Sequence, residues 1–167
     1  MNEIRLLFGK PLIQDRGRLL SAIKDLQYRH GCIVQALDAD KIAGERHIRF
    51  AAKKALAAFS ESRNIAKDAG MEIMRYASGE RQIERALFLR ISDRTERMAL
   101  VLAGSGCSWP DASELSRIIE LDKQGFSFCA KAVKEAFNIS SEELGAVGEE
   151  RIEDLVIERV ALVDTYR

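Results

Sequence analysis

Apolar and polar residues recur along the chain with the periods of both strands and helices. Short apolar runs predict strands, and runs with an apolar residue at every third or fourth position predict helices. The predicted strands are residues 4–9, 32–37, 72–77 and 97–104. The predicted helices are residues 15–31, 46–62, 79–91, 111–121 and 127–137, with a helical turn at 38–44 and a short and then a long helix within 140–166.

Strands that alternate with helices predict an α/β (α+β) fold. We expect a single domain over residues 1–167, in which helices cover a mixed sheet of about four strands and the C-terminal part is helical. A chain of 167 residues is long enough to bury a core of its own. No repeat, low-complexity tract or linker divides it.

No apolar run approaches the roughly 20 residues that span a bilayer, and the first residues lack the basic lead of a signal peptide. We therefore expect a cytoplasmic protein with no membrane partner. The three cysteines are odd in number and have no Cys-x-x-Cys spacing, which predicts free thiols in a reducing compartment.

Charge is distributed unevenly, although the net charge is zero. Residues 41–97 hold 13 Lys and Arg against 8 Asp and Glu, whereas residues 98–167 hold 7 against 13. A basic middle and an acidic end predict two surfaces with different partners. The alternative is a chance asymmetry on a solvated surface.

The predicted helix at residues 46–62 has one apolar face and one cationic face. The apolar face is made by Ile48, Ala52, Ala55 and Phe59. The cationic face carries Arg46, Arg49, Lys53 and Lys54, with His47 at its edge and Phe50 in its middle. A phenylalanine among cations can stack an unpaired base while the cations contact phosphates. Alternatively, a loop covers Phe50 and the lysines are only solvated.

The stretch SGERQIERAL, residues 78–87, raises the same possibility. With Ser78 or Gly79 as the N-cap, the first N–H groups of the predicted helix would be free to bind an anion. Arg81 in the first turn opposes the helix dipole, which is expected where an anion binds. Nearby glutamates could instead pair with the arginines of this helix.

Three segments together resemble a known family. IVQALDADKIAGERHIRFAAKKALAAF, EIMRYASGERQIERAL and RMALVLAG are similar to the small kinase-binding subunit of the KEOPS complex, the TPRKB family, and above all to its archaeal members. Gly44, His47 and residues 78–83 occupy the positions of the family pattern. The resemblance covers most of the chain and is tightest over residues 33–103.

The resemblance implies a non-catalytic subunit of a complex that makes N6-threonylcarbamoyladenosine in tRNA. Its implied partners are the atypical KEOPS kinase/ATPase, the single-stranded 3′ CCA end of tRNA and, indirectly, the threonylcarbamoyl-transferase subunit. Together with the charge pattern, it implies an RNA-binding set: His47, Phe50, Lys53, Lys54, Arg75, Ser78, Gly79, Arg81 and Gln82.

The last predicted helix has a broad apolar arc that contains one arginine. The resemblance implies that this arc faces the kinase. The expected kinase-binding residues are Phe137, Ile152, Leu155, Val156, Arg159, Val160 and Val163. The alternative is that the helix packs inside its own chain while Arg159 extends to solvent.

A second functional hypothesis is a small α/β enzyme that binds a phosphorylated ligand near Gly104–Cys107, in the loop AGSGCSWP after a strand. This loop lacks the lysine of a P-loop and the third glycine of a dinucleotide-binding loop. The two histidines have no metal-ligand spacing with a cysteine, and no nucleophile–base pair is evident. We therefore expect no catalytic residue, no metal and no cofactor.

Overall fold

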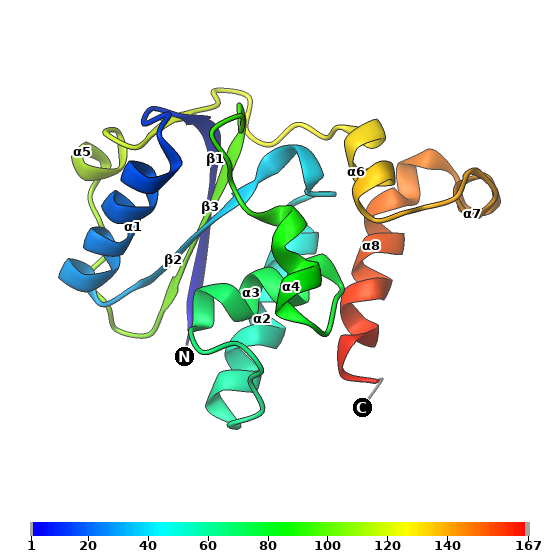
Figure 1. Ribbon diagram of the computed structural model, residues 1–167, viewed down its shortest axis with the longest axis horizontal. Helices are drawn as coiled ribbons and strands as arrows, with labels where there is room; N and C mark the ends of the chain where they lie inside the picture. Colours follow the sequence, from blue (N-terminus) through cyan, green and yellow to red (C-terminus); the bar gives the residue numbers. More distant parts are fainter. Residues whose placement is uncertain (1, 166–167) are drawn as a thin grey trace. The chain divides into compact units, whose positions relative to one another are not determined.

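The computed structural model describes residues 2–165, which divide into two compact units (Figure 1). Unit 1 contains the residues up to Ala39 together with Arg90–Phe126. Unit 2 contains Asp40–Leu89 and the residues from Ser127 onward. The single domain expected over residues 1–167 stays a prediction.

Unit 1 is built on a four-stranded sheet in the order β2-β3-β1-β4. Its strands are β1 (Glu3–Pro11), β2 (Ile33–Asp38), β3 (Met98–Gly104) and β4 (Ile119–Leu121). Every pairing is antiparallel; Leu100 of β3, for example, lies opposite both Leu7 and Ala36. The α+β class is confirmed, and the sheet has four strands as expected. Its fourth strand is β4 rather than the strand predicted at residues 72–77, and the sheet is antiparallel throughout rather than mixed.

Helix α1 (Arg16–His30) packs its apolar face against this sheet (Figure 1). Asp15 caps its N-terminus by accepting the N–H of Arg18, and Gly31 ends it with φ 70°. One core contains apolar residues of the helix and the sheet: Leu19, Ile23, Leu26, Val34, Ala36, Met98, Leu100 and Leu102. Hydrogen bonds from His30 and Arg29 of α1 lower the pKa of Glu114 on α5 (Ala112–Leu115) to about 2.

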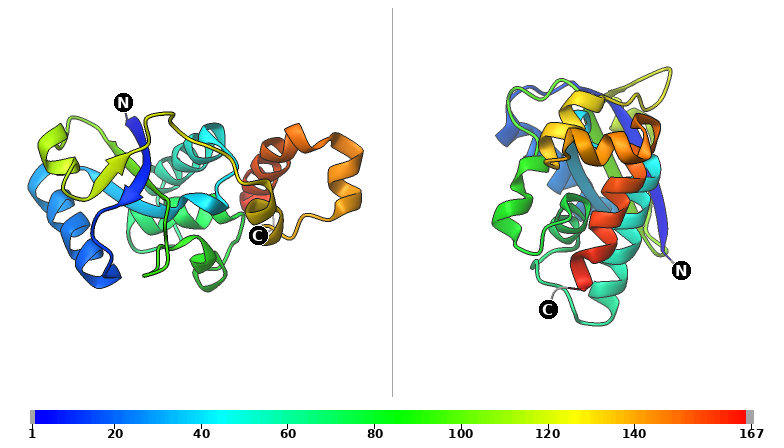
Figure 2. Two further views of the ribbon diagram at one scale, coloured as in Figure 1. Left: turned by 90° about the horizontal axis from the view of Figure 1, so that it is seen from above. Right: turned by 90° about the vertical axis from the view of Figure 1, so that its right-hand side faces the viewer.

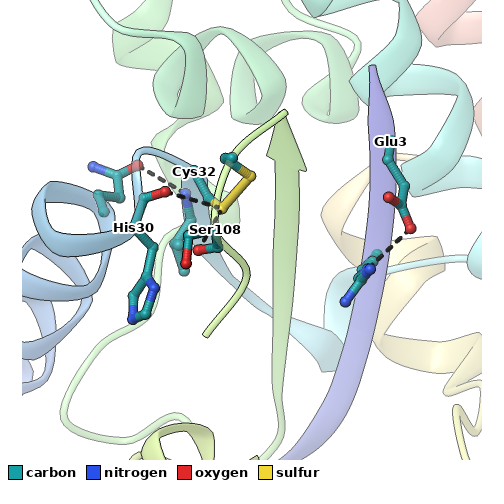
Figure 3. The surroundings of a disulfide bond; sticks show 8 residues. Glu3, His30, Cys32 and Ser108 are labelled. Atoms are coloured by element: carbon teal, nitrogen blue, oxygen red, sulfur yellow. Dashed lines mark hydrogen bonds and ion pairs between the residues drawn. A yellow bond between two sulfur atoms is a disulfide. The ribbon is translucent and has the colours of Figure 1, made fainter. Parts of the chain in front are cut away.

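A disulfide joins Cys32, directly before β2, to Cys107, in the loop after β3 (Figure 3). The Cys32 Sγ also lies 3.6 Å from the carbonyl oxygen of Ser108. The prediction of three free thiols is therefore wrong for this pair, and Cys129 is the free cysteine. The two bonded cysteines lie 75 positions apart, so no local sequence signal marks the bond.

Unit 2 is helical. It contains α2 (Glu45–Ser60), α3 (Ala69–Ser78), α4 (Ile83–Ala86), α6 (Ala130–Ala136), α7 (Ser141–Val147) and α8 (Ile152–Ala161). Short 3₁₀ segments lie at Ala39–Lys41, Leu87–Leu89, Glu149–Arg151 and, after α8, at Leu162–Asp164. Helix α8 lies beside α2 (Figure 2). None of the helices in residues 2–165 has the length and apolar character needed to cross a membrane.

Three predicted elements differ from the structure. The helix predicted at residues 79–91 is α4 followed by the 3₁₀ turn Leu87–Leu89. The strand predicted at residues 72–77 is part of α3, which Asp68 caps by accepting the N–H of Met71. The helix predicted at 111–121 is the single turn α5 followed by β4. A capping box begins this turn: the Asp111 side chain accepts the N–H of Glu114, and the Glu114 side chain accepts the N–H of Asp111.

Candidate functional site

The N-terminus of α2 is capped by a side chain from another helix. Gly44, the N-cap residue, has no side chain, and Glu153 of α8 accepts the N–H of His47 at 3.3 Å. A Cβ on Gly44 would lie only 1.7 Å from this carboxylate. Arg46 donates to Glu153 at 3.0 Å and to Asp154 at 2.8 Å. Gly44 and the first turn of α2, which belong to the family motif, therefore fix the position of α8 through Glu153 and Asp154.

His47 is a core residue of unit 2. Its Nδ1 accepts the N–H of Ala43 at 3.1 Å, which places the ring proton on Nε2, and Nε2 donates to the carbonyl of Ala77 at 2.7 Å. Burial lowers the pKa of His47 to about 4, so the ring is neutral at pH 7. The side chain is completely buried, so it does not reach the surface where a contact with RNA was expected.

Ser78 and Gly79 lie at the end of a helix rather than at its start. Gly79 follows α3 with φ 72° and donates its N–H to the carbonyl of Tyr76. The Ser78 hydroxyl donates to the carbonyl of Arg75 and accepts the N–H of Glu80. The N–H groups of Gly79 and Glu80, which were predicted to be free, are therefore used by the end of α3.

Gly79 also makes a close approach to α8. A Cβ at this position would lie 3.1 Å from the Cβ of Arg159. The glycine is thus required both by its left-handed backbone and by the neighbouring helix. Gln82 is the N-cap residue of α4, which is only four residues long.

An open cleft of about 280 Å³ lies beside α3, lined by Arg63, Ile65, Arg75, Arg81, Val163 and Asp164. A second hollow of about 340 Å³ shares Ile65, Arg75 and Arg81 with it and adds Gln82. We call these seven residues the cationic cleft. Ile65 is 61% exposed in it, which is unusual for an isoleucine between arginines.

A buried ion pair between Arg75 and Glu72 connects two segments that line the cationic cleft. Arg75 donates to Glu72 through two nitrogens, at 2.7 and 3.1 Å, and both side chains are almost completely buried. Glu72 also accepts the N–H groups of Ile65 and Ala66, while Arg75 donates to the carbonyl of Arg81 at 3.2 Å. The pair therefore connects the loop that carries Ile65 to the segment that carries Arg81.

Asp164 connects the cleft to α2. Its carboxylate accepts the Tyr76 hydroxyl proton at 2.6 Å, pairs with Lys54 at 3.2 Å and lies 3.9 Å from Arg63. Burial acts to raise the pKa of Asp164, but the hydrogen bond from Tyr76 and the Lys54 ammonium lower it overall. Lys54 thus reaches the cleft through Asp164, and its ammonium lies 5.9 Å from the ring centre of Phe50.

The residues expected to face the kinase are mostly core. Those buried in unit 2 are Phe137, Ile152, Leu155, Val156, Val160 and Val163. Several of them pack with Ala43, Val133 and Leu144 in one cluster. Arg159 is half-buried and donates to Glu143 and to the carbonyl of Leu155. The alternative interpretation therefore applies: α8 packs inside its own chain, and these residues do not form an exposed apolar patch.

The match to a family model decides the family. The kinase binding protein CGI-121 model matches residues 13–164, nearly the whole chain. The chain belongs to the CGI-121 family. The resemblance to a kinase-binding subunit predicted from the sequence is confirmed, and binding to a kinase is the family's described property. Comparison with curated proteins found no match.

In this member of the CGI-121 family, the structure gathers some predicted RNA-binding residues and separates others. Arg75, Arg81 and Gln82 line the cationic cleft. Lys54 pairs with Asp164 of the cleft and lies near Phe50, and Lys53 is exposed on α2. His47 and Ser78 are buried. Within residues 2–165, no group of three or more His, Cys, Asp or Glu side chains is arranged to hold a metal ion.

Three lining residues were missed by sequence reasoning, namely Arg63, Ile65 and Asp164. Ile65 had a local signal, since it stands in the polar segment SRNIAKD, where an isolated apolar residue has no helical or strand period to join. Asp164 had no local sequence signal, because its position in the cleft depends on how α8 packs against α2 and α3.

Proposed function

We propose that the chain is the non-catalytic, kinase-binding subunit of a KEOPS-type complex that makes threonylcarbamoyladenosine in tRNA, and that its cationic cleft binds the 3′ CCA end of tRNA. In the assembled complex it would contact the threonylcarbamoyl-transferase subunit only indirectly, through the kinase. Membership of the CGI-121 family supports the kinase partner. The single observation that supports the RNA partner is the cleft itself, in which arginines surround an exposed isoleucine.

The chemistry of the cleft suits a single-stranded end. Guanidinium groups bind phosphate oxygens with paired hydrogen bonds, and their planes stack on unpaired bases. Ile65 offers an apolar surface to a base, and the Gln82 amide carries a donor and an acceptor that can meet a base edge. Phe50 and Lys54 extend the surface along α2. Stacking contributes about 1–3 kcal/mol per base, so a few such contacts give micromolar binding.

The kinase contact is proposed for the outward side of α8. Of the seven residues expected to face the kinase, Arg159 retains a substantially exposed side chain, at 28%. Its pair with Glu143 places a charge of each sign at this surface. Charged groups at the edge of an interface set partner choice and association rate more than affinity.

Binding of intact tRNA and of tRNA lacking its CCA end tests the RNA assignment. We expect the truncated tRNA to bind at least about tenfold more weakly, since each lost base removes stacking and phosphate contacts. Equal affinity for both would remove the CCA assignment. No binding to either would leave only the kinase role, which co-purification with the kinase subunit from the same organism tests separately.

The alternative, a small enzyme with a phosphorylated ligand near Gly104–Cys107, gains no support. Cys107 is bonded to Cys32 and offers no thiol. A Cβ on Gly104 would lie 2.8 Å from the Cys107 sulfur, so the disulfide fills the space beside this glycine.

A further inference from the structure

Asp164 is the only acid among the seven residues of the cationic cleft. It belongs to the 3₁₀ turn Leu162–Asp164 that follows α8, whereas the arginines come from the segment between α2 and α4. Its carboxylate accepts a hydrogen bond from the buried Tyr76 hydroxyl, pairs with the Lys54 ammonium and lies 3.9 Å from the Arg63 guanidinium, which also pairs with Glu61. The two cations would suit a phosphate, because carboxylate and phosphate oxygens accept the same charge-assisted hydrogen bonds.

We propose that Asp164 is an internal competitor of the RNA: its carboxylate holds the place of a phosphate in the cationic cleft and is displaced when the single-stranded 3′ end binds. The inference rests on the proposed function and adds to it a regulation of the same site. A phosphate that enters while Asp164 stays would meet a like charge at short range, which is unfavourable.

Glu72 and Asp164 differ in how readily their carboxylates can be exchanged for a phosphate. Glu72 and Arg75 have side-chain exposures of 0% and 4% and are joined by two hydrogen bonds, so their pairing is permanent. The Asp164 side chain is 27% exposed and that of Lys54 is 32% exposed. Ion pairs that are this accessible to solvent are weak, so a phosphate can replace the carboxylate.

The backbone around Asp164 allows this exchange without unfolding. Val163 is buried and anchors the turn, and the N–H of Thr165 donates to the carbonyl of Leu162. Rotation of the Asp164 side chain would release Lys54, while Arg63 keeps its hydrogen bond to Glu61 at 2.6 Å. Lys54 then becomes available to a phosphate, and the salt dependence of binding rises accordingly.

The test is the affinity of the full chain for a fluorescein-labelled single-stranded RNA ending in CCA, measured over a series of salt concentrations. We expect Asp164→Asn to bind about three- to tenfold more tightly than the wild type, with a log–log salt slope steeper by about 0.7 for each additional phosphate that the cations bind. Glu158→Gln, which changes the same net charge at an exposed position of α8, should bind like the wild type. Tyr76→Phe removes the hydrogen bond and keeps the carboxylate, so it should give a smaller increase in affinity.

An Asp164→Asn variant that folds like the wild type but binds no tighter than Glu158→Gln would overturn the inference and leave the proposed function standing. Failure of every variant and of the wild type to bind would instead reject the CCA site, and the inference with it. If Asp164→Asn does not fold, the ¹³C carboxylate resonance of Asp164 in the wild type decides. It should shift when RNA saturates the protein, and an unchanged resonance contradicts displacement.

Discussion

The carboxylate of Glu153 on α8 lies 3.3 Å from the backbone nitrogen of His47 in the first turn of α2. Residues 106 positions apart thus share a helix cap that is normally made by a neighbour in sequence. The negative charge also complements the positive end of the helix dipole. Because Gly44 leaves the space that Glu153 occupies, the start of α2 and the position of α8 depend on each other.

Removal of this cap should destabilise the protein. We expect Glu153→Ala to lower the free energy of unfolding by about 1–2 kcal/mol, as for other lost helix caps. Gly44→Ala should cost a similar amount, because its Cβ would displace the same carboxylate. Urea unfolding of both variants and of the double variant measures the coupling. The double variant should lose clearly less than the sum, and additive losses would mean that the glycine and the acid act independently.

Stability should decrease on mild acidification because of His47. Its pKa is about 4 in the folded protein and about 6.5 when unfolded. Since the unfolded state binds the proton more tightly, the stability due to neutral burial is complete above pH 6.5 and is lost as the pH falls from 6.5 to about 4. The loss over this window is up to about 3 kcal/mol and can be followed by urea unfolding at each pH.

The control for this pH dependence is a variant of His47 itself. His47→Gln should be less stable at pH 7 but should lose the slope. A wild-type stability that stays flat across this window would show that His47 is protonated without cost in the folded state.

Two glycines should respond to alanine in opposite directions. Gly79→Ala should cost about 1–2 kcal/mol, because φ 72° is unfavourable for a residue with a Cβ and that Cβ would press on Arg159. Gly145→Ala should stabilise by up to about 1 kcal/mol, since Gly145 lies within α7 and nothing surrounds its Cβ position. Thermal unfolding midpoints of the two variants should therefore move to opposite sides of the wild type.

Variants on the two sides of α8 separate folding from kinase binding. Val156 is completely buried, so Val156→Glu should destabilise the protein by at least about 3 kcal/mol and should lose the kinase only because the fold is lost. Arg159→Glu should cost about 1 kcal/mol through its lost pair with Glu143, while circular dichroism stays native. If co-purified kinase is undiminished for folded Arg159→Glu, the outward side of α8 is not the kinase contact.

RNA binding should depend on which arginine of the α4 region is changed. Arg81 lines the cationic cleft, and we expect Arg81→Glu to weaken binding of CCA-ended RNA about tenfold and to flatten its salt slope by at least about 0.7. Arg85→Glu makes the same change in net charge at an exposed position outside that lining, and should have a small effect. Equal losses for both would indicate general electrostatic attraction instead of a site.

Much of the fold could be predicted from the spacing of apolar residues and from capping residues. The elements that were predicted wrongly have local physical causes. Residues 72–77 read as a strand because nearly every side chain of α3 is buried, so no polar face reveals the helical period. Asp68 and Gly79, which cap this helix at its two ends, were the signals that favoured a helix. Strand β4 has only three residues and follows a genuine capping box, so helix signals hid it.

The candidate site was predictable only in part. Arg81 and Gln82 stand in a recognisable motif and do line the cleft. The charge on the acidic C-terminal segment gave no hint that Asp164 lies among the cations. The apolar arc of α8 was identified correctly as apolar, but a sequence cannot distinguish a helix covered by its own chain from one covered by a partner.

The disulfide between Cys32 and Cys107 closes a covalent ring that contains the whole first segment of unit 2, Asp40–Leu89. A single protease cut anywhere in residues 33–106 therefore opens the ring without releasing a fragment. The nicked chain keeps its mass under non-reducing conditions and separates into two pieces only after a thiol reductant is added.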